Sequence, residues 1–383
     1  MVMTKRILYI FPGFHFVHLN KDVGQIPYWL MRRGYSVEIL TTDTNLKDNI
    51  FNNIKIIKIK NYKISINPNP NLRIYFGILH YILRNYKNYD VFIMYFPQSI
   101  TTILTTILLK FLDINKKIII KMDSDGKLYT RGKKPIRFIK KIIGNIIFST
   151  LYKLTNVFLI IETPQARKEV IKRHVWLTEK LICIPNGINC EIINIKFKKN
   201  LKPYKIILFV GDIIPRKGID ILIASIKNLK NYNIKLILVG DFSKNKKYFY
   251  KLKKLIKKYN LNNIVEFTGR VNNRKLQYLY NIADIYCSAS RYESYGLTIQ
   301  EAQYFGCAVI ASNVGAAEYL LENGKLGILF KPEDAEQIEH HLKYLLENIN
   351  IVKKLGKISK TRVLTQLCWD KVIEKYIKLI EKK

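Results

Sequence analysis

The 383-residue sequence predicts an α/β protein made of two tandem domains, each built on a doubly wound parallel sheet. The length suits two domains, because a domain commonly has ~100–200 residues. Short β-branched runs alternate with longer helical patterns along the whole chain, as in parallel sheets covered by helices on both faces. A polar, basic segment at residues 191–204 has no helical periodicity and separates two series of such runs. In folds of this class, ligands bind outside the carboxyl ends of the strands, so we expect the site in the cleft between the domains.

The first series of expected strands starts close to the N-terminus and ends before the linker. It consists of Arg6–Phe11, Ser36–Thr41, Val91–Tyr95, Lys117–Lys121, Val157–Ile161 and Leu181–Ile184. The apolar part of the first run is too short for a signal peptide. The longest apolar stretches, near residues 100–112 and 142–161, are interrupted by polar side chains and fall short of a membrane span of about 20 residues. We therefore expect no transmembrane helix.

The second series follows the linker and repeats the same alternation. Its strands are expected at Lys205–Val210, Lys235–Val239, Ile264–Thr268, Ile285–Ser288, Ala308–Ala311 and Gly327–Phe330.

The net charge of +36, from 65 Lys and Arg against 29 Asp and Glu, is the unusual property of the composition. Such an excess is typical of proteins that bind nucleic acid or anionic membranes. The chain is also rich in Ile, Asn, Tyr and Phe, a bias that AT-rich codons produce, so the charge has a purely compositional explanation as well. No helix-turn-helix, zinc or RNA-binding motif accompanies it, which makes nucleic-acid binding the weakest interpretation.

The five cysteines are odd in number and contain no Cys-x-x-Cys pair. This pattern predicts neither a disulfide framework nor a zinc site, and it favours a reducing, cytoplasmic setting.

Two acidic side chains in the second half form the first candidate site. Glu293 lies in a loop after an expected strand, Gly296 permits a close backbone approach, and a helix starting near Leu297 carries Glu301. The two carboxylates can therefore face one pocket beside the free N–H groups of a helix start. Such N–H groups suit a phosphate, and carboxylates suit sugar hydroxyls.

A basic loop after the strand that ends at Val210 forms the second candidate site. It runs from Gly211 to Gly218 and carries Arg216 and Lys217 at the carboxyl end of that strand. Cations in this position can hold a diphosphate as it becomes a leaving group.

Residues 293–312 resemble the signature of the retaining glycosyltransferases of family 4, in which two glutamates are separated by seven residues. The matching residues are Glu293, Ser294, Gly296, Leu297, Glu301, Ala302, Gly306, Val309, Ile310, Ala311 and Ser312, while Tyr295 and Ala308 replace the usual Phe and Pro. The segment IPNGIN at Ile184–Asn189 is similar to the family's Pro-Asn-Gly signature before the linker.

This resemblance implies the GT-B architecture, with two Rossmann-like domains facing a central cleft. Residues 1–198 would bind the acceptor, residues 199–369 the nucleotide sugar, and a last helix at about 370–383 would cross back onto the first domain. The implied activity is transfer of a hexose-type sugar from a nucleoside-diphosphate sugar to a glycan or lipid-linked acceptor, with retention of configuration.

The resemblance also assigns roles within the site. Glu293 would contact the transferred sugar and Glu301 the ribose, and Lys217 matches the family's diphosphate lysine. Asp212 stands where the family has an arginine, so the second cation would come from Arg216 or Arg291. The remaining donor-side residues are Gly211, Gly296, Leu297, Tyr295, Arg270 and Val271.

On the acceptor side we expect Gly13, His15 and the pair Asp123 and Asp125. In other glycosyltransferases an Asp-x-Asp tripeptide holds a divalent metal, but here it falls in the acceptor domain. We therefore expect Asp123 to act as a catalytic or substrate contact, and transfer to need neither metal nor cofactor; a simple turn cap is the alternative.

Residues 126–161 contain eight Lys and Arg side chains and no Asp or Glu, with apolar residues interleaved. A basic amphipathic helix of this kind would suit a peripheral protein on an anionic membrane, or a core helix with a solvated lysine face. Two other functions remain open for the chain as a whole: a GT-B relative acting as a sugar-nucleotide epimerase, and a phosphorylase with pyridoxal phosphate on a lysine.

Overall fold

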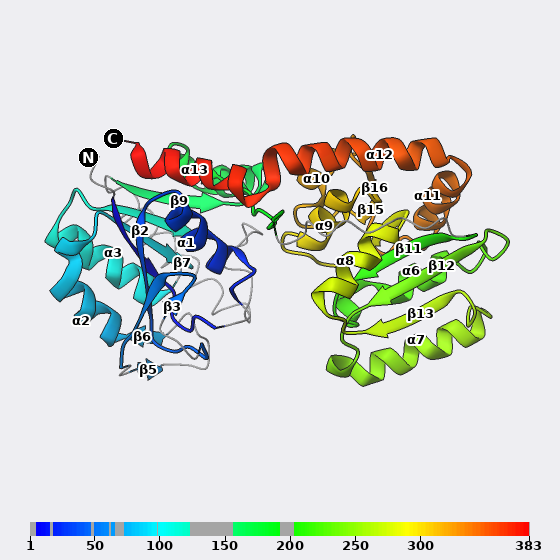
Figure 1. Ribbon diagram of the computed structural model, residues 1–383, viewed down its shortest axis with the longest axis horizontal. Coiled ribbons are helices and arrows are strands. Elements are labelled where there is room, and N and C mark those ends of the chain that lie inside the picture. Colours follow the sequence, from blue (N-terminus) through cyan, green and yellow to red (C-terminus); the bar gives the residue numbers. More distant parts are fainter. Residues whose placement is uncertain are drawn as a thin grey trace. The chain divides into compact units, whose positions relative to one another are not determined.

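The computed structural model describes residues 5–15, 18–46, 50–60, 63–65, 73–97, 99–122, 156–191 and 203–382. The chain divides into two compact units (Figure 1): unit 1 comprises Met1–Gly187 and Trp369–Lys383, and unit 2 comprises Ile188–Cys368. Asp123, Asp125 and residues 126–155 of the basic segment lie outside the described residues.

Unit 1 contains an eight-stranded sheet with the order β10-β9-β8-β7-β1-β2-β4-β3. All strands are parallel except β3, which pairs with β4 in the antiparallel direction. The strands are β1 (Arg6–Ile10), β2 (Ser36–Thr41), β3 (Ile50–Phe51), β4 (Ile54–Lys58), β7 (Val91–Tyr95), β8 (Lys117–Lys121), β9 (Val157–Ile161) and β10 (Leu181–Cys183). A separate two-stranded sheet pairs β5 (Lys63–Ser65) with β6 (Arg73–Tyr75).

Helices cover both faces of this sheet, because alternate side chains of each strand enter two different cores. In β1, Ile7 and Tyr9 pack with α1 and α13, whereas Leu8 and Ile10 pack with α2, α3 and α5. The helices are α1 (Asp22–Arg32), α2 (Phe76–Asn85), α3 (Ile100–Leu112), α5 (Pro164–Arg173) and α13 (Trp369–Glu381), with short turns η3 (Tyr86–Asn88) and η4 (Val175–Leu177).

Unit 2 contains a six-stranded parallel sheet with the order β13-β12-β11-β14-β15-β16. Its strands are β11 (Lys205–Val210), β12 (Ile234–Val239), β13 (Val265–Gly269), β14 (Ile285–Ser288), β15 (Ala308–Ser312) and β16 (Ile328–Phe330). One core is formed with α6 (Ile219–Ser225), α7 (Lys246–Lys258), α11 (Ala335–Glu347) and α12 (Ile349–Arg362). The other is formed with α8 (Asn273–Ile282), α9 (Leu297–Phe305), α10 (Ala317–Leu320) and the π-helical turn η7 (Val363–Leu367). The predicted pair of doubly wound parallel sheets is confirmed.

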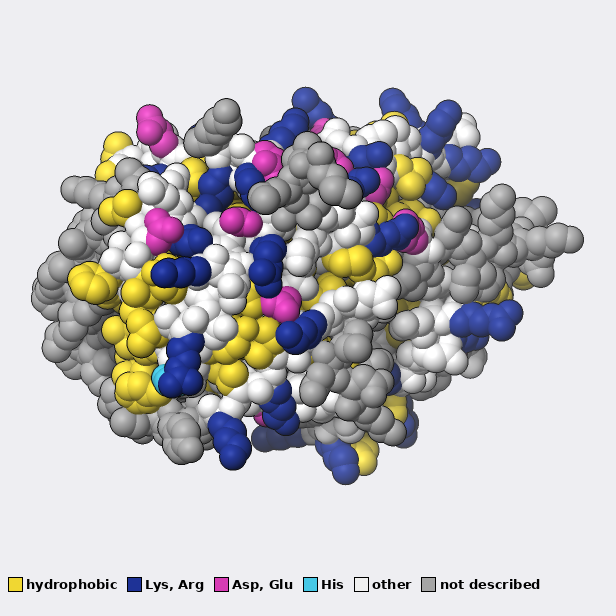
Figure 2. Space-filling view, turned by 60° about the vertical axis from the view of Figure 1, so that its left-hand side comes forward, with side chains coloured by type: hydrophobic (Ala, Val, Ile, Leu, Met, Phe, Trp, Pro, Cys, Tyr) yellow, Lys and Arg dark blue, Asp and Glu magenta, His cyan; other side chains and the backbone are white. Residues whose placement is uncertain are grey.

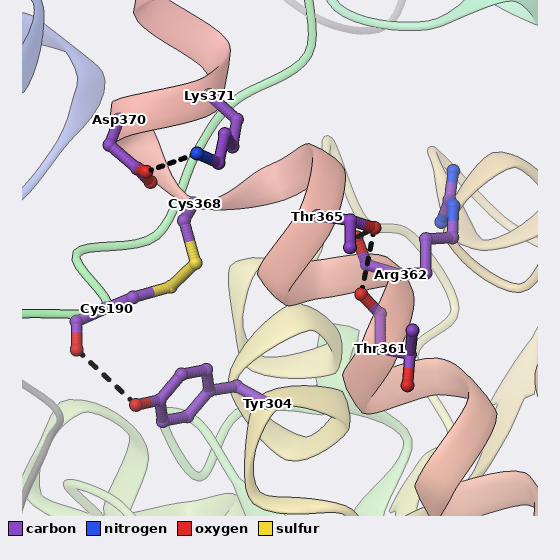
Figure 3. Close-up of a disulfide and its surroundings, with 8 residues drawn as sticks. All are labelled: Cys190, Tyr304, Thr361, Arg362, Thr365, Cys368, Asp370 and Lys371. Carbon is purple, nitrogen blue, oxygen red and sulfur yellow. Dashed lines mark hydrogen bonds and ion pairs between the residues drawn. A yellow bond between two sulfur atoms is a disulfide. The ribbon is translucent and has the colours of Figure 1, made fainter.

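A disulfide joins Cys190 to Cys368, which corrects the expectation that the cysteines form no bridge. The two residues are 178 positions apart in the sequence, with Cα atoms 5.7 Å apart. Figure 3 shows the bond beside Tyr304, whose hydroxyl donates a hydrogen bond to the Cys190 carbonyl at 3.4 Å. Because Ile188 also forms a parallel bridge with Cys368, the chain enters and leaves unit 2 side by side. The argument from the cysteines to a reducing compartment therefore loses its basis.

Across the described ranges, no helix combines the length and the apolar character needed to traverse a bilayer.

Candidate functional site

An ion pair between Lys217 and Glu293 lies at the carboxyl edge of the unit 2 sheet. Lys217 ends the 3-10 turn η5 (Pro215–Lys217) after β11, and Glu293 lies in the loop after β14. The Lys217 ammonium donates a hydrogen bond to Glu293 Oε2, and the two side chains are only 13% and 14% exposed. A cation and a carboxylate that the sequence assigned to one ligand are thus in direct contact.

The two loops that carry this pair are bound to each other by further hydrogen bonds. The Arg291 N–H donates to the Arg216 carbonyl at 2.8 Å, and the Arg216 guanidinium donates to the Tyr292 carbonyl at 2.8 Å. Gly218 follows in the left-handed region, with φ 63°, and a Cβ there would lie 1.9 Å from the Ala289 carbonyl oxygen. Only glycine allows this approach, which fixes Lys217 against the end of β14.

Arg291 is bound by carboxylates on two sides. Its guanidinium donates to both oxygens of Asp220, at 2.9 and 3.1 Å, and also pairs with Glu333. Burial alone would raise the pKa of Asp220, but hydrogen bonds from Arg291 and Tyr248 hold that pKa below its ordinary value. Arg216 has a looser partner, Glu293 at 3.6 Å, and its side chain is 41% exposed. To bind a ligand, Arg291 would have to leave two carboxylates and Arg216 only one, so Arg216 is the arginine more available to a ligand.

Lys244 is a basic residue near this edge that the sequence analysis did not single out. Its ammonium lies 2.7 Å from the carboxylate of Asp212, the residue that follows Gly211 at the end of β11. The unusual acidic residue at position 212 therefore holds a lysine. In the sequence this residue belongs to a lysine-rich segment, SKNKK, in which no pattern distinguishes it from the neighbouring lysines.

Glu301 is held by a buried tyrosine. The Tyr280 hydroxyl, on α8, donates to Glu301 Oε2 at 2.7 Å, and Tyr280 is 1% exposed and stacked on Phe305. Within the described residues, no hydrogen bond is donated to Glu301 Oε1. Burial raises the pKa of Glu301, and the Tyr280 hydrogen bond partly opposes that rise.

The other residues that the sequence predicts for the donor side have different surroundings. Gly296 has a φ of 89° and precedes α9, which begins at Leu297 without a side-chain cap. The first-turn N–H groups of α9 thus have no capping side chain. Tyr295 is 5% exposed and accepts a hydrogen bond from Gln300 at 3.2 Å, so its ring belongs to the core. Beyond β13, the side chain of Arg270 is exposed and that of Val271 is half-buried.

In unit 1, Gly13 and His15 lie in the loop after β1, as the sequence predicts. The N–H of Gly13 donates to the Thr41 hydroxyl at 3.2 Å, and His15 Nε2 lies 3.8 Å from the Asp43 carboxylate. The loop therefore places the His15 imidazole within reach of one carboxylate, that of Asp43.

A buried ionic cluster at the same sheet edge in unit 1 was not predicted. Lys121, at the end of β8, is 2% exposed, and its ammonium donates to Asp22 at 2.6 Å, Glu162 at 2.5 Å and Asn186 at 2.9 Å. Asn186 comes from the Pro-Asn-Gly segment, which gives that signature a structural role in fixing the ends of β8 and β9.

In the part of the chain that the structure describes, no three His, Cys, Asp or Glu side chains converge as metal ligands.

Comparison with known proteins shows which sequences this chain is similar to. Residues 191–362 match the family model "Glycosyl transferases group 1". Over 99% of its length the chain is 28% identical to an uncharacterized glycosyltransferase of Methanocaldococcus jannaschii, 99% of which is covered.

The fold comparison extends over both units. The crystal structure of a glycosyltransferase from Rickettsia africae superposes on this chain with a TM-score of 0.78 and 20% sequence identity. The match covers 99% of this chain and 98% of the Rickettsia chain. The Anabaena protein HepE, solved in complex with UDP and glucose, covers 98% of each chain with a TM-score of 0.70 and 14% identity. By the match over residues 191–362 the chain is similar to the glycosyltransferases of group 1, and over both units it has the GT-B fold.

Proposed function

We propose that the protein transfers a hexose-type sugar from a nucleoside-diphosphate sugar to a glycan or lipid-linked acceptor, with retention of configuration. The contact between Lys217 and Glu293 carries the proposal, because it puts a cation for the diphosphate beside a carboxylate for the sugar. The complex of HepE with UDP and glucose supports a donor of this class.

In this mechanism Lys217 and the first-turn N–H groups of α9 stabilise the diphosphate as the glycosidic bond breaks. Glu293 accepts hydrogen bonds from the sugar hydroxyls, and Glu301 Oε1 accepts one from a ribose hydroxyl. When the diphosphate arrives, the Lys217 ammonium exchanges its carboxylate partner for a phosphate oxygen. No protein nucleophile takes part; the acceptor attacks from the face that the diphosphate leaves. Positioning and electrostatics therefore supply the catalysis.

We assign acceptor binding to unit 1, with Gly13 and His15 at the carboxyl edge of its sheet and Asp123 and Asp125 from the part of the chain outside the described residues. The charge of +36 supports placing the reaction in the cytoplasm at the inner face of a membrane, where a lipid-linked acceptor is anchored.

The reaction itself is tested by following nucleoside-diphosphate release and the product anomer by NMR. The proposal predicts release that depends on an added acceptor and a product with the donor's anomeric configuration. An inverted product would contradict retention, and acceptor-independent conversion of the sugar nucleotide would favour an epimerase.

Metal independence is the second part of the proposal, since cations and helix N–H groups already serve the diphosphate. We expect transfer rates to be unchanged in excess EDTA. Loss of activity on chelation, with recovery on adding Mg²⁺ or Mn²⁺, would contradict it.

Replacing the two glutamates separates their roles. We expect Glu301→Ala to raise the donor KM about 10- to 100-fold, since a charge-assisted hydrogen bond contributes roughly 1.5–3 kcal/mol. We expect Glu293→Ala to act mainly on kcat, because this carboxylate contacts the sugar as its bond breaks. Steady-state kinetics with a soluble acceptor measures both. If both variants have the kinetic constants of wild type, the roles assigned to Glu293 and Glu301 are wrong.

Tyr280→Phe tests how Glu301 is positioned. The titratable side chains facing Glu301 are Tyr280 on α8 and Tyr286 on β14, and burial raises the pKa of both, so both stay neutral. Without the Tyr280 hydroxyl, the pKa of Glu301 rises further. An ionised Glu301 binds the ribose, so the donor KM increases as the pH falls through that pKa, and in the variant this increase begins at higher pH.

Tyr286→Phe is the matched control, because its hydroxyl donates to Thr298 at 2.8 Å. Its profile of donor KM against pH should follow the wild type. Superimposable profiles for all three proteins would show that Tyr280 has only a packing role.

A further inference from the structure

An apolar groove runs between α2 and α3 of unit 1, on their sides away from the sheet. It has a volume of about 560 Å³ and is lined by Phe76, Leu79, His80, Leu83, Leu104, Ile107, Leu108 and Phe111. Phe111 is 87% exposed, Leu83 51% and Ile107 45%. The opposite sides of the same helices already fill the core, with Ile78, Ile82 and Leu109 fully buried. The groove is therefore apolar surface that the fold does not need, and contiguous surface of this kind marks an interaction site.

The charges around the groove are predominantly positive. Its lining contains no acidic side chain, and Arg84 and Lys87 are exposed where α2 ends and η3 follows. The nearby acids are engaged: Asp113 lies 3.8 Å from Lys116, and Asp90 accepts a hydrogen bond from the Arg6 N–H at 2.7 Å. Figure 2 shows apolar side chains gathered on the forward-turned face with Lys and Arg beside them.

The charge of the chain decides between the partners that such a groove can accept. A second copy of the chain carries the same net charge of +36, so electrostatic repulsion between the two copies opposes self-association. An anionic bilayer attracts the same charge and also offers an apolar layer for protruding side chains. We propose that α2 and α3 dock the protein on an anionic lipid surface, with Phe111 and Leu83 inserted at the boundary of headgroups and acyl chains.

The proposal goes beyond the donor chemistry and is tested on the full chain by vesicle sedimentation. The vesicles contain phosphatidylcholine alone or phosphatidylcholine with phosphatidylglycerol. Wild type should pellet with the anionic vesicles and be released by salt, which screens the charges. Leu83→Ser combined with Phe111→Ser should weaken binding at least about tenfold, since it removes inserted apolar surface. Both side chains are exposed, so folding is retained.

Val175→Ser is the matched control, because Val175 is 71% exposed in the same unit but does not line the groove. It should bind vesicles like wild type, and donor turnover should be equal in all three proteins. Equal vesicle binding by the double variant and wild type would overturn the proposal. So would absence of wild-type binding, or a wild-type dimer in sedimentation equilibrium that the double variant dissociates. None of these outcomes affects the donor-site assignment, which is measured by turnover.

Discussion

Lys217→Ala is expected to lower kcat/KM for transfer roughly 30- to 1000-fold. A preorganised donor aimed at developing charge contributes roughly 2–4 kcal/mol to transition-state stabilisation, and each 1.4 kcal/mol corresponds to about a factor of ten. Lys217 is the cation best placed for this, because its ammonium already contacts Glu293 and its backbone is fixed by Gly218. Steady-state kinetics with a soluble acceptor provides the measurement.

Lys230→Ala is the control for this experiment, since Lys230 is an exposed lysine of the same unit. Lys217→Arg keeps the charge and should recover part of the activity. The role assigned to Lys217 fails if its alanine variant loses no more activity than the Lys230 variant, or if the loss is accompanied by a lower unfolding temperature.

Breaking the disulfide is expected to reduce the free energy of unfolding of unit 2 by about 2–5 kcal/mol. In the loop-closure model a cross-link stabilises more as the closed loop lengthens. Here the bond closes a loop that comprises nearly the whole unit, since Cys190 and Cys368 are 178 positions apart. The unfolding of unit 2 in urea can be monitored by hydrogen exchange of its peptides. The urea concentration at the midpoint should be lower for Cys190→Ser, and for wild type in reductant, than for oxidised wild type.

Thiol titration in denaturant, without reductant, is the accompanying check. The disulfide leaves three free thiols, those of Cys183, Cys287 and Cys307. Cys183→Ser is the control and should keep its sensitivity to reductant. Five titratable thiols together with a midpoint that reductant does not change would contradict the bond.

The sheets could be predicted from the sequence because buried parallel strands are continuous apolar runs rich in β-branched residues. Ile118–Ile120 and Ile206–Val210 are examples, and their side chains face both helical layers. β4 was missed, since its five residues, IKIIK, include two lysines and resemble a solvated segment. In the sheet β4 lies between β2 and the edge strand β3, with Ile54 and Ile56 buried and Lys55 exposed.

The parts of the site that escaped prediction depend on contacts between distant residues. Lys121 looks like the solvated end of a strand, yet Asp22, Glu162 and Asn186 converge on it from three other segments. The partner of Cys190 is equally remote, because only the return of the chain at Cys368 brings the sulfur atoms together. By contrast, Glu293 and Glu301 were found because both belong to one local loop-and-helix signature.

The central claim, that unit 2 binds a nucleoside-diphosphate sugar through Glu301 and Lys217, is tested most directly by thermal unfolding with a panel of such sugars. Ligand binding to the folded state raises the unfolding temperature by mass action. The account predicts that at least one sugar nucleotide raises the unfolding temperature of wild type and that Glu301→Ala abolishes or strongly reduces this rise. A panel that leaves the wild-type unfolding temperature unchanged, or raises it equally in Glu301→Ala, would contradict the claim.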